Sequence, residues 1–167
     1  IFVHSLRVLG LAFDDIYFTA GDGVRLNGWF MPYAGSRITL LWFHGNAGNI
    51  SHRLENIKLL HNKVQINVFI FDYRGYGRSE GRVSEEGTYR DGEAALKYLR
   101  NRKEIDPRRI VFFGRSLGAA VAADLATREE YLALILETPF VSIREMAKAA
   151  FPFLPIGPLL RIRYDVA

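Results

Sequence analysis

The chain has 167 residues, of which 49% are apolar, and its 22 Lys and Arg residues slightly outnumber its 18 Asp and Glu residues. This is enough chain for one domain with a hydrophobic core, and the scattered basic residues indicate a solvated surface rather than a nucleic-acid partner. The absence of cysteine excludes a thiol nucleophile, a disulfide framework and a thiolate zinc site.

The sequence gives no sign of a transmembrane segment. No stretch approaches the roughly 18 uninterrupted apolar residues that would span a bilayer. The absence of cysteine is compatible with the cytoplasm, the location that we favour. Because the chain starts with Ile1 and stops at Ala167 without a capped helix, we expect a single domain over residues 1–167 that is truncated at its C-terminus.

The first predicted element is a β-hairpin over residues 15–31. Two runs of β-forming residues flank Gly21-Asp22-Gly23, which is a turn signal. Residues 38–43 then form a continuous apolar run that ends abruptly at His44. Such a run predicts a strand buried on both faces, as in a parallel sheet.

Helices and strands alternate in the next part of the chain. Apolar residues at helical spacing predict a helix over residues 50–60, with Asn49 or Ser51 as its cap. Residues 68–71 predict another buried strand. A second helix is expected from Ser84 to Leu99, since acidic residues suit its first turn.

The same alternation continues to the fourth parallel strand. Residues 110–113 predict a strand, residues 119–123 lie in a helix rich in small side chains, and residues 132–136 predict a further strand. The order predicts an α/β fold with a mostly parallel, doubly wound sheet, helices on both faces and an N-terminal antiparallel hairpin at one edge. If the chain ends at Ala167, residues 132–136 form an exposed sheet edge, and we expect self-association there.

Ser116 is the candidate nucleophile. It lies in Gly114-Arg115-Ser116-Leu117-Gly118, a G-x-S-x-G motif that follows a predicted strand and opens a predicted helix. In that context the serine sits on a sharp turn with its hydroxyl raised above the sheet. The alternative is an ordinary glycine-rich turn in which the serine caps the helix.

A second glycine-rich loop, His44-Gly45-Asn46-Ala47-Gly48, follows the earlier strand. Negative charge on a tetrahedral intermediate needs preorganised N–H donors, and glycine lets the backbone approach closely. We expect the backbone N–H groups of Asn46 and Leu117 to form an oxyanion hole. The alternative is a plain turn that ends a strand, and His44 is expected to brace this loop rather than carry a proton.

Four segments in this order resemble the α/β-hydrolase superfamily, in its Bem46-like and protein-depalmitoylase-related branch of small serine hydrolases. These segments are Trp42 to Gly48, Asp72 to Ser79, Gly114 to Gly118 and Glu137 to Phe140. The resemblance covers about residue 15 to the end and implies a serine, acid and histidine triad in that chain order. It also implies no cofactor, and ester, thioester or amide substrates; we expect no metal site.

The chain departs from that pattern because no histidine follows Ser116. The resemblance therefore implies that the last strands, the triad acid and the triad histidine lie beyond residue 167. Glu137 could act as the acid only if the usual one were missing. Asp72 is expected to organise its loop through Arg74 or through backbone amides.

The sequence thus predicts a serine hydrolase that cleaves carboxylic ester or thioester bonds of small acyl substrates through an acyl-enzyme on Ser116. The apolar, proline-broken segment 142–160 is expected to line an acyl pocket, or else simply to cover the sheet. The alternative function is a non-catalytic scaffold used for binding or assembly. Nucleotide binding is disfavoured because the glycine spacing of the known phosphate loops is absent.

Overall fold

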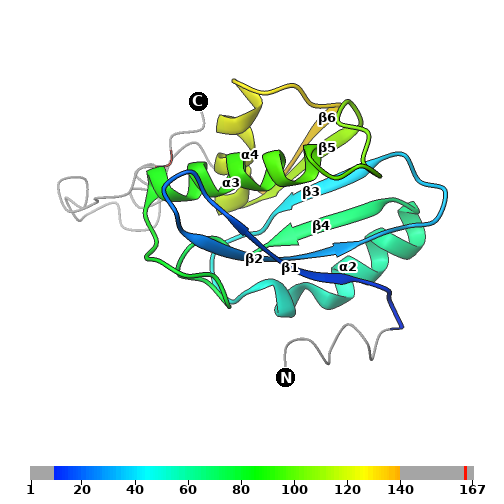
Figure 1. Ribbon diagram of the computed structural model, residues 1–167, viewed down its shortest axis with the longest axis horizontal. Helices are drawn as coiled ribbons and strands as arrows, with labels where there is room; N and C mark the ends of the chain where they lie inside the picture. Colours follow the sequence, from blue (N-terminus) through cyan, green and yellow to red (C-terminus); the bar gives the residue numbers. More distant parts are fainter. Residues whose placement is uncertain (1–9, 140–163, 165–167) are drawn as a thin grey trace.

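The computed structural model describes residues 10–139 and residue 164 (Figure 1). Its centre is a six-stranded sheet in the order β1-β2-β4-β3-β5-β6. The strands are β1 (Asp14–Thr19), β2 (Arg25–Met31), β3 (Thr39–Phe43), β4 (Asn67–Phe71), β5 (Ile110–Arg115) and β6 (Ala133–Glu137). β1 and β2 form an antiparallel hairpin, β2 is antiparallel to β4, and the remaining pairs are parallel. The predicted mostly parallel sheet with a hairpin at one edge is confirmed.

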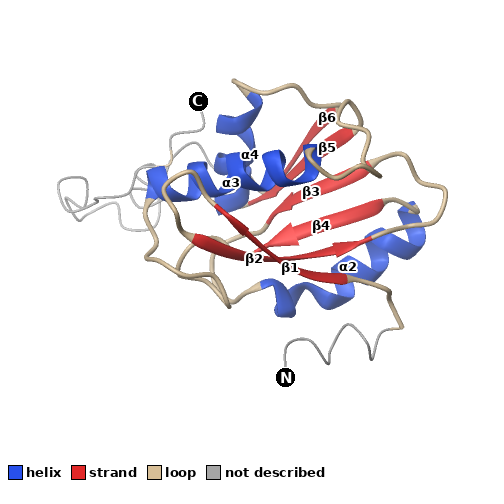
Figure 2. Ribbon diagram, viewed as in Figure 1, coloured by secondary structure: helices blue, strands red, loops and turns tan. Residues whose placement is uncertain are grey.

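Helices cover both faces of this sheet, as Figure 2 shows. They are α2 (Leu54–Leu59), α3 (Glu85–Arg100) and α4 (Leu117–Ala126). Alternate residues of each strand face opposite sides. Phe43 belongs to the core cluster that holds Leu96 of α3 and Val121 of α4, whereas Trp42 belongs to the cluster that holds Ile57 of α2. The continuous apolar runs of the strands are therefore explained by burial on two faces.

The first predicted helix differs from the structure. Residues 50–60 do not form one regular helix: a 3₁₀ turn (Ile50–Arg53) precedes α2, and a π-helical turn (Leu60–Val64) follows it. The Asn49 side chain accepts a hydrogen bond of 2.9 Å from the N–H of Ser51, only two residues ahead. This close capping favours a tighter first turn than an α-helix has. Of the two predicted caps, Asn49 is the one observed.

The second predicted helix is confirmed as α3. The hydroxyl of Ser84 accepts a hydrogen bond of 3.1 Å from the N–H of Gly87, which satisfies one of the unpaired donors of the first turn. Glu85 and Glu86 place negative charge near the positive end of the helix dipole. In the part of the chain that is described, none of the helices is long and apolar enough to cross a membrane.

β6 lies one residue later than predicted, at Ala133–Glu137. The N–H of Leu132 is already engaged with the carbonyl of Ile110 at 2.8 Å, in the approach to the strand. Among the described strands, β6 pairs on one side only, with β5. Leu132 and Ile135 are each 49% exposed there, so this edge carries exposed apolar side chains.

We predict that the 167-residue chain self-associates through β6. Sedimentation velocity at rising protein concentration should show dimers or larger species, and Ile135→Lys should shift the distribution toward monomer, because a charge on an edge strand opposes pairing. Leu59→Lys, at a similarly exposed apolar position on α2, is the matched control and should leave the distribution unchanged. A strictly monomeric wild-type chain at high concentration contradicts this prediction.

Candidate functional site

Ser116 occupies a strained turn between β5 and α4. Its backbone has φ 51° and ψ −117°, in the left-handed half of the map, which is rare for a residue with a side chain. The N–H of Ser116 donates to the carbonyl of Glu137 at 3.0 Å, which fixes the turn to the end of β6. Such strain persists only where the surroundings hold it and is often found at active sites.

The loop after β3 packs directly against this turn. β3 and β5 are parallel and Phe43 pairs in register with Gly114, so the loops that follow them leave the same edge of the sheet. A Cβ atom on Gly45 would lie 3.4 Å from the Cβ of Ser116, and one on Gly118 would lie 1.9 Å from the carbonyl oxygen of Phe43. Glycine at position 118 is what allows the start of α4 to approach the end of β3 this closely, and glycine at position 45 avoids a tight contact with the Ser116 turn.

Backbone strain gathers at this edge of the sheet. Ala47 has φ 68°, Ser116 has φ 51° and Thr138 has φ 47°, and each residue lies in a loop that follows a parallel strand. The carboxyl ends of parallel strands are where α/β proteins place their ligand sites. The strain therefore marks the same location as the glycine-rich motifs.

Of the two predicted oxyanion donors, Leu117 directly follows Ser116 in the chain, and Asn46 lies on the loop whose Gly45 approaches the Ser116 turn. Leu117 is the first residue of α4, so its N–H has no carbonyl one turn earlier in the helix to bond. Asn46 is exposed and directly follows Gly45, whose backbone contacts the Ser116 turn. Both residues are thus next to the candidate nucleophile, and their role in an oxyanion hole remains a proposal.

His44 braces its loop from within the core. Its ring is fully buried, with Nδ1 2.8 Å from the carbonyl oxygen of Gly45 and Nε2 3.5 Å from Oδ1 of Asp72. Asp72 also accepts a hydrogen bond of 2.9 Å from the N–H of Ile50. The predicted contact of Asp72 with backbone amides is confirmed. The alternative contact with Arg74 is wrong, because the Arg74 side chain turns to Asp22 and Asp91.

No base for Ser116 is found within the described residues. His52 accepts from the N–H of Asn49 at 3.1 Å, and His61 contacts the carbonyl of Pro32 at 2.9 Å, so neither is engaged with the serine. The Glu137 carboxylate lies 3.7 Å from Arg115, and both side chains are partly exposed. The predicted acyl-pocket segment 142–160 lies outside the described residues.

The sequence analysis missed a pair of tyrosines on the loop that follows β4. The Tyr76 hydroxyl donates to the side-chain oxygen of Asn46 at 2.6 Å, and the Tyr73 hydroxyl donates to the carbonyl of His44 at 3.2 Å. Burial raises the pKa of both phenols. The segment from Asp72 to Gly77 contains both tyrosines, but its spacing does not indicate which residues their hydroxyl groups bond.

Comparison with known proteins decides the family. A family model described as "Serine aminopeptidase, S33" matches residues 35–162. The chain belongs to this family of α/β-hydrolases, in its Bem46-like branch. It is 48% identical over 150 residues to the α/β hydrolase domain-containing protein WAV2 of Arabidopsis thaliana, with 87% of this chain and 49% of that protein covered. It is 39% identical over 156 residues to protein bem46 of Schizosaccharomyces pombe, with 90% and 52% covered.

Solved α/β-hydrolases share the fold. An α/β hydrolase of Vibrio vulnificus has a TM-score of 0.80 and 25% identity, over 99% of this chain and 63% of that one. An esterase of Pyrococcus furiosus has a TM-score of 0.75 and 26% identity, over 89% and 58%. The chain spans about half the length of the curated relatives named above.

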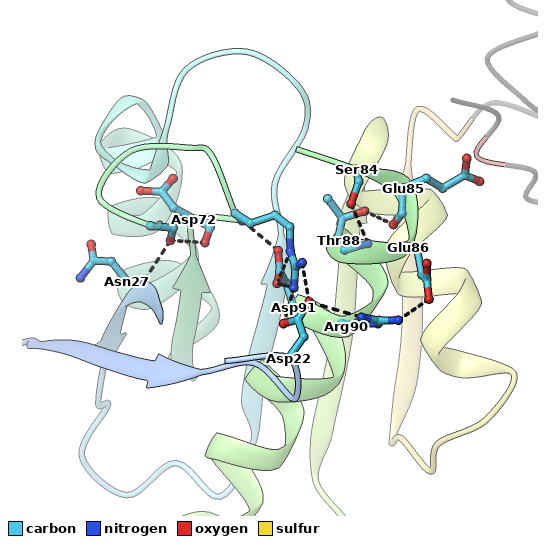
Figure 3. A network of polar contacts seen from close by, with 12 residues as sticks. Asp22, Asn27, Asp72, Ser84, Glu85, Glu86, Thr88, Arg90 and Asp91 are labelled. Atoms are coloured by element: carbon cyan, nitrogen blue, oxygen red, sulfur yellow. Dashed lines mark hydrogen bonds and ion pairs between the residues drawn. The ribbon is translucent and has the colours of Figure 1, made fainter. Parts of the chain in front are cut away.

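An ion-pair cluster anchors the loop after β4 of this α/β-hydrolase. Arg74 donates two hydrogen bonds to Asp22 of the hairpin turn, at 2.7 and 3.0 Å, and its Nε and Nη2 donate to Asp91 of α3 at 3.0 and 2.8 Å. Figure 3 shows Asp22 and Asp91 converging from these two elements. The hydrogen bonds from Arg74 lower the pKa of Asp22 to about 2, whereas burial raises the pKa of Asp91.

Alternative functional sites would be metal-binding clusters or surface hollows away from Ser116. Within residues 10–139 and 164, no group of three acidic or histidine side chains could hold a metal ion. A hollow of about 530 Å³ is lined by Arg37, Asp106, Arg108, Arg109 and Leu132. These residues lie at the amino ends of β3, β5 and β6, at the end of the sheet opposite to Ser116.

We predict that Gly118→Ala destabilises the protein by about 3 kcal/mol, at the upper end of the usual cost of overpacking, because the new Cβ would meet the backbone of Phe43 and His44 rather than a movable side chain. Urea unfolding measures this change. Gly21→Ala is the matched control, since nothing lies within 4 Å of its Cβ position, and should cost no more than about 0.5 kcal/mol. Equal urea midpoints of unfolding for the two variants would show that position 118 does not lie this close to the Phe43 backbone.

We also predict that Arg74→Met destabilises the protein by about 3–5 kcal/mol, since it leaves the buried Asp91 carboxylate without its partner. Arg128→Met is the matched control. Arg128 also pairs with two carboxylates, of Asp124 and Glu93, but its side chain is 46% exposed, so its loss should cost less than about 1 kcal/mol. Similar unfolding free energies for both variants would contradict the anchoring role of Arg74.

Proposed function

We propose that the protein is a serine hydrolase that cleaves carboxylic ester or thioester bonds through an acyl-enzyme on Ser116. The observation that carries the proposal is the strained Ser116 turn at the carboxyl edge of the parallel sheet, with φ 51°, packed against the Gly45 loop. A serine that only capped a helix would have no need of this strain, since capping residues adopt extended backbone angles.

The chemistry needs donors for the oxyanion. Attack of the serine oxygen on the carbonyl carbon forms a C–O bond and places negative charge on the carbonyl oxygen. We propose that the N–H groups of Asn46 and Leu117 stabilise that charge, since they belong to the two loops that meet at Ser116. The N-terminal end of α4 adds a favourable dipole.

The chemistry also needs a base. Serine is a weak nucleophile until its proton is removed, and the same group must return a proton to the leaving group. His44, His52 and His61 are engaged elsewhere in the structure. We propose that a histidine outside these 167 residues supplies the base, with an acid that orients it.

The choice of ester or thioester over amide bonds is part of the proposal. The description of the matching family names an aminopeptidase, whereas the Pyrococcus furiosus neighbour is an esterase. We favour acyl esters because the sequence predicts an apolar lining after β6. The second candidate function is a non-catalytic scaffold. The observation on its side is that, among the described residues, no histidine is bonded to the Ser116 hydroxyl.

Ester hydrolysis by three proteins tests the proposal: the 167-residue chain, the product of the complete reading frame, and that product with Ser116→Ala. We predict turnover by the complete product and its loss, by about a thousandfold or more, in Ser116→Ala. The 167-residue chain should show no triad-dependent turnover. A complete product that is no faster than its Ser116→Ala variant would favour the scaffold. A 167-residue chain as fast as the complete product would show that one of its own histidines is the base.

A further inference from the structure

We propose that Tyr76 is a positioning residue for the oxyanion hole, because its hydroxyl holds the side chain of Asn46 and so fixes the N–H of that residue beside Ser116. This inference rests on the proposed function. The contact spans 30 positions of the sequence, with the tyrosine oxygen 2.6 Å from Oδ1 of Asn46. No feature of the two motifs taken separately indicates it.

The segment around Asn46 needs an external support. It follows the end of β3, precedes the capped 3₁₀ turn at Ile50, and belongs to neither. Ala47 and Gly48 both have positive φ, at 68° and 72°, so the segment is neither helix nor strand, and side chains such as His44, Arg53 and Tyr76 make the contacts that hold it. An oxyanion donor is effective only when its direction is set before the charge develops.

The loop after β4 provides this support at three points. The Tyr73 hydroxyl donates to the carbonyl of His44 before Asn46, Tyr76 donates to Asn46 itself, and Asp72 accepts from the N–H of Ile50 after it. Tyr73 and Asp72 are buried, so they set the ends of the segment. The Tyr76 contact reaches the Asn46 side chain, and His44 Nδ1, 2.8 Å from the carbonyl oxygen of Gly45, contacts the peptide that carries the Asn46 N–H.

The support is itself anchored to the rest of the fold. The N–H of Arg74 donates to Asp91 at 2.8 Å, in addition to the side-chain ion pairs, and this ties the loop to α3. The Tyr76 ring also packs edge-on against His44, with 5.6 Å between ring centroids, a contact that helps to place the ring. Because burial raises the pKa of Tyr76, the phenol keeps the proton that it donates.

Tyr76→Phe removes the hydroxyl and leaves the ring packing in place, so it isolates the hydrogen bond. In the product of the complete reading frame, with p-nitrophenyl butyrate as substrate, we expect kcat to fall about tenfold while KM stays within about twofold, since the loss is felt in the transition state. A variant that is only less stable would give less active enzyme. It would not lower kcat once the rate is divided by the concentration of active sites, measured by covalent labelling.

A double-mutant cycle shows whether Tyr76 acts through Asn46. Asn46→Ala removes the same bond from the other side, and the double variant should be no slower than the slower single variant, because both changes delete one interaction. Asn46→Ala also keeps the proposal testable if Tyr76→Phe folds poorly. Tyr98→Phe is the matched control: its hydroxyl bonds Arg102 at 3.1 Å, away from Asn46, and kcat should not change.

Two results overturn the inference. A Tyr76→Phe variant with kcat within twofold of the wild type, or additive effects of the two changes, would show that the contact does not position the donor. Ser116→Ala in the same assay separates the causes: if it abolishes hydrolysis while Tyr76→Phe does not affect it, only the inference fails. If Ser116→Ala remains active, the proposed function is wrong, and the inference about Tyr76, which rests on it, is wrong as well.

Discussion

The parallel pairing of β3 with β5 is the constraint on which the candidate site depends. Because Phe43 lies in register with Gly114, the loops that follow these strands must cross at the same edge of the sheet. A side chain at position 118 would collide with the backbone of Phe43, and one at position 45 would lie tightly against the Arg115 carbonyl oxygen, at 3.2 Å. Glycine at these positions lets the backbone of one loop reach Ser116 on the other, and the strained φ of Ser116 is the conformation that fits this crossing.

The loop after β4 supports the segment that follows β3. Its buried Arg74 links the β1–β2 turn to α3, two elements that are far apart in the sequence. Burial of these charges is tolerable because each carboxylate receives hydrogen bonds from the same guanidinium. The tyrosines of that loop then contact the segment after β3, so the hairpin, α3 and the candidate oxyanion loop form one connected structure.

The sequence predicted most of the fold because the signals were local. Continuous apolar runs predicted β3, β4 and β5 within one or two residues at each end, and Ser84 with its acidic neighbours predicted the start of α3. Regular periodicity suggested one helix after Asn49, but it could not show the 3₁₀ and π-helical turns, which depend on capping and on the path to β4. The Tyr76 to Asn46 bond and the Arg74 cluster join residues 17 to 52 positions apart, and no spacing rule predicts such pairs.

The central claim is that Ser116 is a nucleophile, and covalent labelling tests it most directly. The product of the complete reading frame would be treated with a fluorophosphonate, and the mass of the intact protein and of its peptides would be measured. The account predicts one phosphonyl group per chain, on the peptide that contains Ser116, with fluoride as the leaving group. A protein that remains unlabelled, or that carries the group on another residue, would contradict it.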